Sequence, residues 1–530
     1  MKTKALMAGV MLAAATTATA GGILTNTNQS IDFLRNPARD AVIGLDGVYS
    51  NPAGVAFLPK GFHLGLNWQY AHQTRTITST NPFFALGRKN GGATTKEFEG
   101  VADAPCIPSI QAAYNWNNWS LQFNFSVPGG GGKCEFADGL GSFESVVGSI
   151  AQKFQSIDNF AQQLNSAAAL YPLMGLPTPA DLPTYGVSGY NMDGYMQGRQ
   201  YYFGFQLGSA YKINENLSVY GGLRLLYGTA TYKAKISNIM VNTAGGLVGF
   251  ESFLPNVPAQ AQAVANRAQE VLTLINSAQQ AGAQLPEAVL TQKAQIEGGL
   301  AQLAGGQSEL ANLSKYAQGV NLLCNQSSVG VAPIVGVDYR LGRWNLAAKY
   351  EFKTQIRMKN ESTVNEASEI AAVNKFRDGE EVNEDQPALL SVGAQYSPID
   401  QVRINAGWHH YFDKDANWYN NSQRLLDHDS NEFLLGVEWD INDRLTASVG
   451  GQLTRYGLTD DYMNDMSFVV NSYSLGFGAN YKLNDVVTLK AGYFQTNYGD
   501  YNRVNYPAAG MSDSFTRTNK VLGIGCDLTL

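Results

Sequence analysis

The sequence predicts an all-β fold, a 14-stranded antiparallel transmembrane β-barrel with an N-terminal hatch in its lumen and helical loops at one end. Three observations favour this fold class. Apolar and polar residues alternate through much of the chain, short and long connections follow one another in turn, and aromatic residues make up 11% of the chain but charged residues only 15%. A closed barrel with one lipid-facing surface and one wet surface averages to such a composition.

The first element is a secretory signal peptide over residues 1–20. Lys2 and Lys4 precede an apolar run, and the segment ends on Ala18-Thr19-Ala20, a cleavage sequence of the A-x-A type. The mature chain is therefore expected to begin at Gly21. No later stretch of about 18 apolar residues follows, which excludes a helical inner-membrane protein. The mature chain is then either soluble or crosses a membrane as strands.

Residues 21–61 precede the first alternating segment and show little alternation themselves. A barrel of fourteen strands has an interior wide enough to need a plug, so this segment is the expected hatch. It contains the motif Asn51, Pro52, Ala53, Gly54, which predicts a turn. The Asn-Pro pair biases the chain toward a turn, and glycine permits close approach of the backbone.

The barrel itself is expected over residues 62–530. In one strand, Phe433, Leu435, Val437 and Trp439 share one face and the residues between them share the other. The same alternation recurs in fourteen segments, an even number, as single-chain bacterial barrels require. These segments lie near residues 62–79, 106–115, 119–127, 198–213, 217–238, 329–341, 343–358, 386–398, 401–413, 430–441, 444–457, 466–482, 486–498 and 514–530.

The connections between these segments alternate between short turns and long loops. In outer-membrane barrels the short turns face the periplasm, so both chain ends are expected there, in the outer membrane of a Gram-negative bacterium. A large soluble β-sandwich or propeller also has alternating strands. It does not predict this order of connections, nor aromatic residues beside the short turns, such as Trp344, Tyr396 and Trp439.

Two extracellular loops, at about 128–197 and 239–328, are too long to be plain connectors. Apolar residues recur at helical spacing in 143–170 and in 259–316, so we expect amphipathic helices above the barrel. Two interpretations of these helices are open. Their apolar faces either pack on each other or build an apolar cleft outside the membrane.

The hatch carries a motif that resembles a known family. The run Leu34 to Ala41, followed by Tyr49 to Ala56, is similar to the hatch of the FadL/TodX family, outer-membrane transporters of long-chain fatty acids and other hydrophobic compounds. The close motif match covers about residues 30–60. The resemblance implies passive uptake of a hydrophobic ligand, with long-chain fatty acids as the first expectation, by binding, hatch movement and lateral release.

The resemblance also implies a kinked third strand that opens a gap in the wall. The corresponding residues here are Pro128, Gly129, Gly130, Gly131 and Gly132. Proline cannot donate to a sheet ladder and glycine adds no packing, so a break in strand pairing is reasonable there. The alternative is that these residues simply begin the long loop.

Several charged residues fall on the polar face of their strands, where they should pair inside the barrel or hold the hatch. They are Lys349, Glu351, Lys353, Arg403, Glu438 and Lys490. A ligand carboxylate would need a cation, and the candidates are Arg35 and Arg39 in the hatch with Arg403 and Lys490 in the wall. The sequence does not rank these four.

Enzymatic chemistry has little support in the sequence. There is no GxSxG or HExxH motif, and His409 and His410 are neighbours on opposite faces of a strand, so they cannot share a metal. We expect no catalytic residue, metal or cofactor, although an outer-membrane lipase is formally possible. One disulfide among Cys106, Cys134 and Cys324 is also possible in an oxidising compartment.

The remaining alternatives concern partners. The net charge of −7 comes without a basic block, so nucleic acid is not an expected partner. The expected partners are a hydrophobic small molecule, outer-membrane lipid and the barrel-assembly machinery, with the protein itself a monomer. A receptor for haem or another small ligand is a second reading, although such receptors usually have a larger plug and more strands. An adhesive or structural barrel is a third.

Overall fold

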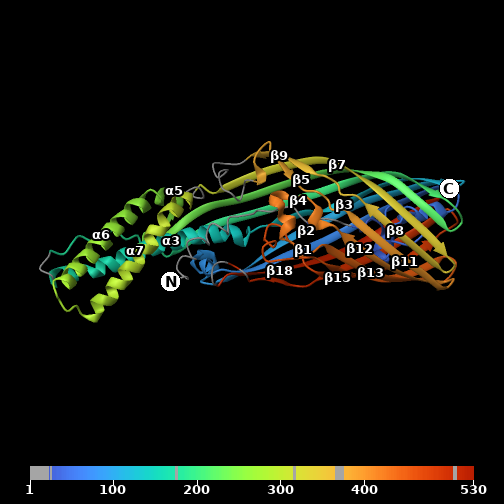
Figure 1. The fold of residues 1–530 in the computed structure, drawn as a ribbon. Helices are drawn as coiled ribbons and strands as arrows, with labels where there is room; N and C mark the ends of the chain where they lie inside the picture. Colours follow the sequence, from blue (N-terminus) through green and yellow to red (C-terminus); the bar gives the residue numbers. More distant parts are fainter. Residues whose placement is uncertain are drawn as a thin grey trace.

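The computed structural model describes Ile23 and residues 27–173, 177–313, 318–363, 375–504, 506 and 510–530. These residues form a closed antiparallel β-barrel with a lobe of helices beyond one end (Figure 1). The first strand, β1 (Gly61–Thr80), closes the barrel by pairing with the last, β18 (Ser512–Thr529), from His63 opposite Thr529 to Thr80 opposite Ser512. The predicted signal peptide lies outside the described residues.

The sheet has eighteen strands. Four of them extend or border other strands and do not add to the circumference of the barrel, which leaves the fourteen wall strands that the sequence predicts. Of these four, β9 (Arg357–Thr363) continues β8 (Trp344–Glu351), β10 (Glu381–Asn383) leads into β11 (Leu389–Ile399), and β6 (Gly246–Gly249) and β17 (Tyr501–Arg503) are short additions near strand ends. The other wall strands are β2 (Thr95–Trp116), β3 (Trp119–Phe136), β4 (Gly189–Lys212), β5 (Leu217–Thr243), β7 (Val320–Leu341), β12 (Val402–Tyr411), β13 (Ser430–Asp440), β14 (Leu445–Arg455), β15 (Ser472–Lys482) and β16 (Val487–Tyr498).

The predicted alternation corresponds to an outer and an inner face of the wall. In β13, Phe433 and Leu435 are 51% and 60% exposed on the outside, whereas Leu434 and Glu438 are 4% and 3% exposed on the inside. The outer surface is thus apolar and the lumen is lined by polar side chains and the hatch. Beside the short turns, the rings of Trp344 and Tyr396 stack with their centroids 4.5 Å apart. Aromatic side chains at such a level are typical of a membrane interface.

Several strands are longer than the alternation predicts. The third strand, β3, continues to Phe136 and β4 begins at Gly189, so the first long loop spans 137–188 rather than 128–197. Likewise β5 ends at Thr243 and β7 begins at Val320, so the second spans 244–319 rather than 239–328. The pairing continues past the apolar outer belt, and beyond that belt the outward residues are no longer apolar. The period-two signal therefore fades before the strand ends.

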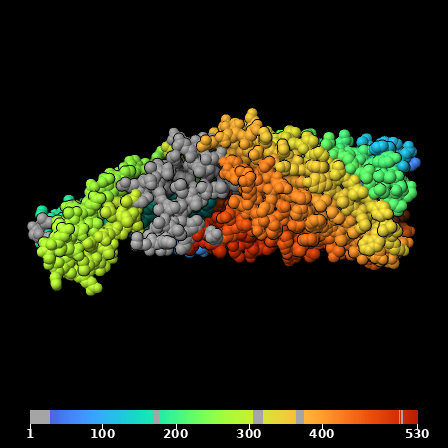
Figure 2. Space-filling model, viewed as in Figure 1, coloured from blue at the N-terminus to red at the C-terminus, as the bar shows by residue number. Residues whose placement is uncertain are grey.

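The long loops form the predicted helices: α3 (Gly141–Ala167), α6 (Asn256–Gln280) and α7 (Glu287–Leu313), with the short α4 (Leu170–Leu173) and α5 (Phe250–Phe253). The ring of Phe154 in α3 lies 5.6 Å from that of Phe250 and 5.1 Å from that of Phe253. The apolar face of α3 is therefore covered by neighbouring helices. Figure 2 shows α6 and α7, in yellow-green, standing apart from the body of the barrel. No helix among the described residues is long and apolar enough to cross a membrane.

Short 3₁₀ helices complete the structure. Those in the loops are η3 (Pro82–Leu86), η4 (Arg88–Asn90), η8 (Asp413–Asp415) and η9 (Tyr419–Leu425). The hatch contains the helix α2 (Ile31–Arg35) and the 3₁₀ helices η1 (Leu45–Val48) and η2 (Gly54–Phe57). Ile31, Leu34 and Val48 are fully buried. The hatch is thus a compact plug inside the barrel rather than a loose tail.

All four cysteines are free thiols, so the possible disulfide among Cys106, Cys134 and Cys324 is not formed. Cys106 is exposed, whereas Cys134 and Cys324 are buried on strands that do not pair with each other. The sequence placed these residues in or beside loops, but the longer strands carry them in the wall.

Candidate functional site

The first half of the hatch lies against a row of lumen-facing glycines in the wall. In β11 to β18 these are Gly393, Gly407, Gly436, Gly450, Gly476, Gly478, Gly492 and Gly523, which we call the glycine belt. A Cβ added at Gly393 would lie 2.6 Å from Cβ of Asp40, and one at Gly450 would lie 2.7 Å from Cδ of Pro37. The hatch therefore packs on wall backbone, at a distance that no larger residue allows.

The strand register joins these glycines into one surface. Gly450 lies opposite Gly436 on one side and Gly476 on the other, and Gly492 lies opposite both Gly478 and Gly523. Sequence reasoning missed this belt. The signal was present, because glycine recurs at lumen-facing positions of consecutive strands.

The motif residues Asn51 to Gly54 form a turn that docks on three strands. Nδ2 of Asn51 donates to Oδ2 of Asp338 in β7 at 2.6 Å, and N of Gly54 donates to Oδ1 of Asn51 at 3.2 Å. The carbonyls of Pro52 and Ala53 accept hydrogen bonds from Gln122 in β3 at 2.8 Å and Ser218 in β5 at 2.7 Å. The motif thus fixes the second half of the hatch to the wall.

Other hatch carbonyls are satisfied in the same way by wall side chains. The amide of Asn345 donates to O of Ala41 at 2.7 Å, and the ammonium of Lys349 donates to O of Tyr49 at 2.8 Å. Further donors are Gln206 to Val48 and Asn115 to Val55. A buried carbonyl without a partner is costly, so these side chains are what allows irregular backbone to lie inside the barrel.

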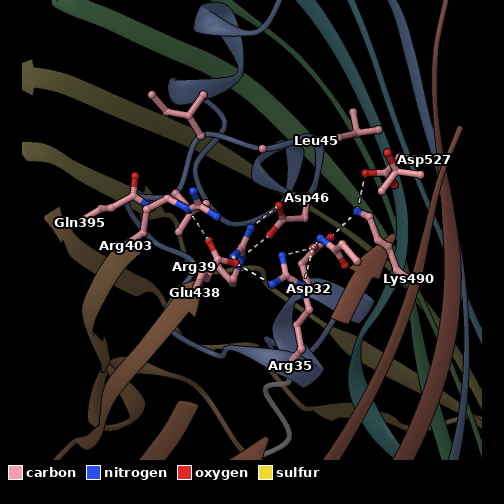
Figure 3. Close-up of a pocket in the computed structure, with 15 residues that line it drawn as sticks. Asp32, Arg35, Arg39, Leu45, Asp46, Gln395, Arg403, Glu438, Lys490 and Asp527 are labelled. Atoms are coloured by element: carbon pink, nitrogen blue, oxygen red, sulfur yellow. Dashed lines mark hydrogen bonds and ion pairs between the residues drawn. The ribbon is translucent and has the colours of Figure 1, made fainter. Parts of the chain in front are cut away.

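All four predicted cations line one cavity of about 340 Å³ under the hatch, as Figure 3 shows. Nη1 of Arg35 lies 2.8 Å from Oε1 of Glu438, and Nε of Arg39 lies 2.7 Å from Oδ2 of Asp46. Nη1 of Arg403 lies 2.6 Å from Oδ2 of Asp440. The ammonium of Lys490 bridges Asp32 and Asp527. Each cation therefore already has a carboxylate partner within the protein.

Two of these ion pairs, Arg35 with Glu438 and Lys490 with Asp32, connect the hatch to the wall. Burial would raise the pKa of Asp32, but the charges of Lys490 and Arg35 hold it well below its usual range. Asp32 is thus a carboxylate at neutral pH and is held by the wall residue Lys490. A ligand carboxylate at this cavity would have to displace a protein carboxylate, which leaves a buried charge without a partner.

A histidine of the wall also holds the hatch. Nε2 of His409 lies 2.8 Å from Oδ1 of Asp40, and its Nδ1 lies 2.8 Å from Oε2 of Glu432. His410 instead faces Asn431 on the other side of the strand, as the alternation predicts. Among the described residues, no group of three or more His, Cys, Asp or Glu side chains is arranged to hold a metal ion. Sequence reasoning did not find the His409–Asp40 contact, since nothing in the sequence relates the two positions.

The pairing of β2 with β3 is interrupted in the middle of the wall. Gly100 to Ala102 pair with Phe136 to Cys134, and pairing resumes only at Ile110 opposite Phe125. The part of β3 that does not pair with β2, residues 126–133, contains Pro128 and Gly129 to Gly132 and keeps its pairing with β4 on the other side. These residues lie inside the strand and do not begin the loop, so the alternative interpretation of them is wrong. The facing part of β2 contains Pro105 and Pro108. These prolines also indicate interrupted pairing, and sequence reasoning missed them.

The hatch residue Gln29 spans this interruption from the lumen. Its Nε2 donates to O of Val127, and its Oε1 accepts from N of Val127, both at 3.0 Å. The carbonyl of Gln29 accepts from Oγ of Ser109 at 2.5 Å and from Nε2 of Gln111 at 3.0 Å. One hatch residue therefore connects β2 and β3 where they do not connect to each other. Sequence reasoning did not single out Gln29.

The comparisons with known proteins agree with this architecture. No protein-family model matches the chain, and no curated protein matches it in sequence. Among solved structures, the toluene transporter TodX of P. putida is 12% identical with a TM-score of 0.52, over 92% of this chain and 94% of that one. A FadL homologue of Pseudomonas aeruginosa is 11% identical with a TM-score of 0.54, over 97% and 100%. At such low sequence identity, the similarity to these structures concerns the fold alone.

The protein is therefore a β-barrel of the outer-membrane type. Within that class it has the fold of the FadL/TodX hydrophobic-compound transporters, with a hatch in the lumen and an interrupted pairing between its second and third strands. The resemblance read from the hatch motif is confirmed at the level of the fold.

Proposed function

We propose that this protein carries hydrophobic compounds across the outer membrane by passive binding, movement of the hatch and lateral release between β2 and β3. The observation that carries the proposal is the interrupted β2–β3 pairing covered from inside by Gln29. Two solved structures that share the fold support it, since one is a toluene transporter and the other is a FadL homologue. Long-chain fatty acids are the first ligand class to test.

The closed state is one in which the hatch replaces part of the missing ladder. Without Gln29, both the N–H and the C=O of Val127 would lose a hydrogen bond, at a cost of roughly 1–3 kcal/mol for each group left unsatisfied. A movement of the hatch that withdraws Gln29 leaves an opening whose edges carry Pro105, Pro108 and Pro128. None of these prolines has an N–H to donate. Pairing between the two edges is therefore weakened once the hatch has moved.

An apolar cluster lies in the lumen beside the opening. Phe33 of the hatch packs in a cluster with Phe494 and Val521 of the wall. Ala104 and Ile107, from the part of β2 that does not pair with β3, pack against the same cluster. A hydrophobic molecule in the lumen thus meets apolar side chains up to the edge of the opening. Removing apolar surface from water contributes about 25 cal/mol per Å². The apolar cluster and lipid both provide this burial, so transfer from one to the other needs no energy source.

The orientation follows from the class of fold. Short turns in such barrels face the periplasm, so the end that holds Leu530 would be periplasmic and the helical lobe would lie outside the cell. A signal peptide over residues 1–20 would direct export, and the barrel-assembly machinery would insert a monomeric barrel into outer-membrane lipid. In this orientation the ligand enters from the side of the helices and leaves sideways through the wall.

The test is to restore the missing donors. In a triple variant, Pro105→Val, Pro108→Val and Pro128→Val return three N–H groups to the facing edges, so β2 and β3 can pair. We expect uptake of radiolabelled toluene and hexadecanoate, by a bacterial host lacking its own transporters, to fall to the background of the empty host. Pro333→Val is the matched control, because Pro333 lies in the uninterrupted pairing of β7 with β5. Undiminished uptake by a folded triple variant would refute the lateral route.

A further inference from the structure

Two arginines face each other across the seam that closes the barrel. Arg75 in β1 lies directly opposite Arg517 in β18. Both occupy lumen-facing positions, because Ile77 and Phe515, two residues away on the same strands, are fully buried inside. Both arginines are half-buried. The seam therefore places two positive charges next to each other in the lumen.

Among the described residues, no carboxylate forms an ion pair with either arginine, and Nε of each is buried without a hydrogen-bond partner. Nη1 of Arg517 is 3.4 Å from O of Phe468, and Nη2 is 3.5 Å from Oε1 of Gln73, both long contacts to neutral acceptors. Like charges directly opposite in a sheet are destabilising. The pair is thus unlike the four cations under the hatch, each of which has a carboxylate.

Apolar side chains lie near the pair on both sides along the two strands. Ile77 and Phe515, both buried, are the next lumen-facing residues on the loop side. On the hatch side the polar Gln73 and Asn519 come first, and the buried Ala71 and Val521 follow. Cζ of Arg517 lies 5.2 Å from the centroid of the Tyr498 ring. Two cations close to buried apolar side chains match an elongated molecule with an apolar chain and one charged end.

The position of the pair relates it to the proposed route. Arg75 lies opposite Gly100 in β2, and Gly100 lies opposite Phe136 in β3. These residues belong to the last paired stretch before the β2–β3 interruption begins after Ala102. The arginines therefore sit at the level of the loop-side edge of the opening, where a ligand coming from the helices would first meet it.

We propose that Arg75 and Arg517 form a binding site for the carboxylate of an amphipathic ligand. A guanidinium presents its donors in a planar fork that matches a carboxylate, and one bound carboxylate removes the repulsion between the two cations. The site deepens the proposed function and rests on it, since it assigns the transported molecule to the carboxylic acids. It stands apart from Arg35, Arg39, Arg403 and Lys490, whose charges are already neutralised.

The experiment compares three probes that share one chain: dodecanoate, the neutral dodecanol and dodecyl phosphate. Binding to the purified full-length protein in a non-ionic detergent is measured by titration calorimetry. The variants are Arg75→Gln, Arg517→Gln and both together, with Arg75→Lys plus Arg517→Lys to keep the charge. Arg444→Gln, in an exposed turn, is the control. Protease resistance of the barrel establishes that each variant is folded.

We expect the wild type to bind dodecanoate at least roughly tenfold more tightly than dodecanol, as charge-assisted hydrogen bonds imply. The double Gln variant should lose this difference and keep its dodecanol affinity, and the Lys variant should recover most of it. An unchanged preference for dodecanoate, or an equal loss for both probes, would overturn the site. Tighter binding of dodecyl phosphate would overturn the carboxylate in favour of a lipid phosphate. If no probe binds at all, the proposed function itself fails.

Discussion

The side-chain amide of Gln29 forms two hydrogen bonds with the backbone of Val127, each 3.0 Å long, and so takes the place of a neighbouring strand. Val127 lies in the part of β3 that has lost its pairing with β2. The wall at this point is therefore complete only while the hatch is in place. A movement of the hatch that withdraws Gln29 therefore also opens the wall at Val127.

Replacing Gln29 with Ala should loosen the wall at Val127. The variant removes both hydrogen bonds between Gln29 and Val127, so hydrogen exchange at Val127 should speed up by roughly tenfold or more. Gln122→Ala is the control, because Gln122 also holds the hatch, at O of Pro52, but away from the interruption. Equal exchange at Val127 in the wild type and the Gln29 variant would contradict this role.

Placing a methyl group in the glycine belt should displace the hatch. In Gly393→Ala the new Cβ would lie 2.7 Å from N of Ala41, a backbone atom that cannot move alone. We expect a loss of about 1–3 kcal/mol, as for other overpacked interiors, measured by urea unfolding in detergent. Gly221→Ala provides the comparison, since an added Cβ there meets nothing within 4 Å. If both variants unfold at the same urea concentration, the belt does not hold the hatch.

Removing the positive charge of Lys490 should destabilise the plugged barrel strongly. Lys490→Met leaves Asp32 and Asp527 facing each other without a cation. Breaking a buried pair in this way costs about 3–5 kcal/mol. Lys482→Met removes an exposed lysine whose partner Asp485 is almost fully exposed, so it should cost less than about 1 kcal/mol. The measurement is again the midpoint of urea unfolding, and similar midpoints for the two variants would disprove the prediction.

The loop residue Asp465 should make stability depend on pH. Burial, with a smaller effect of the nearby Asp513, raises its pKa from 3.8 to about 6, while its Oδ2 accepts a hydrogen bond from N of Ser142 at the start of α3. Because the folded protein holds this proton more tightly than the unfolded chain, the cost of the charge is present above pH 6. That cost is relieved as the pH falls from 6 toward 4.

Asp465→Asn should therefore raise the thermal unfolding temperature at pH 7.5 and have little effect at pH 4. Asn keeps an oxygen that accepts from Ser142 but carries no charge. Asp461→Asn, in the exposed part of the same loop, should change neither value. A stabilisation by Asp465→Asn that is equal at both pH values would show that charge is not the cause.

Much of the barrel could be predicted from the sequence because the outer face of its wall is apolar and the inner face is mostly polar. The outward residues Phe433 and Leu435 and the inward residue Glu438 alternate with a period that the backbone imposes. The short turns follow from the same pattern. The strand ends could not be predicted so well, since β3 runs on to Phe136 and its outward residues there, Lys133 and Glu135, are charged.

The site was predicted less completely, for a physical reason. Local signals such as Pro128 and Asn51-Pro52 were visible, because proline and glycine restrict or free their own backbone. Long-range contacts left no such trace. Nothing near Asp40 in the sequence points to His409, and nothing near Gln29 points to Val127. Arg75 and Arg517 become a pair only through the register of the closing seam. The sequence pointed to four cations, and the structure shows that each of them is neutralised.

The closing seam also constrains the order in which the protein can be built. The backbone groups of Phe62 and Leu530 hydrogen-bond each other at 2.8 and 2.7 Å, and Gly61 leads from the hatch straight into the strand that makes this contact. Because the hatch is joined directly to β1, we expect it to enter the lumen before β1 and β18 pair. The hatch and the barrel would then fold together, and a hatch peptide added later to barrels of residues 61–530 should fail to bind in the lumen.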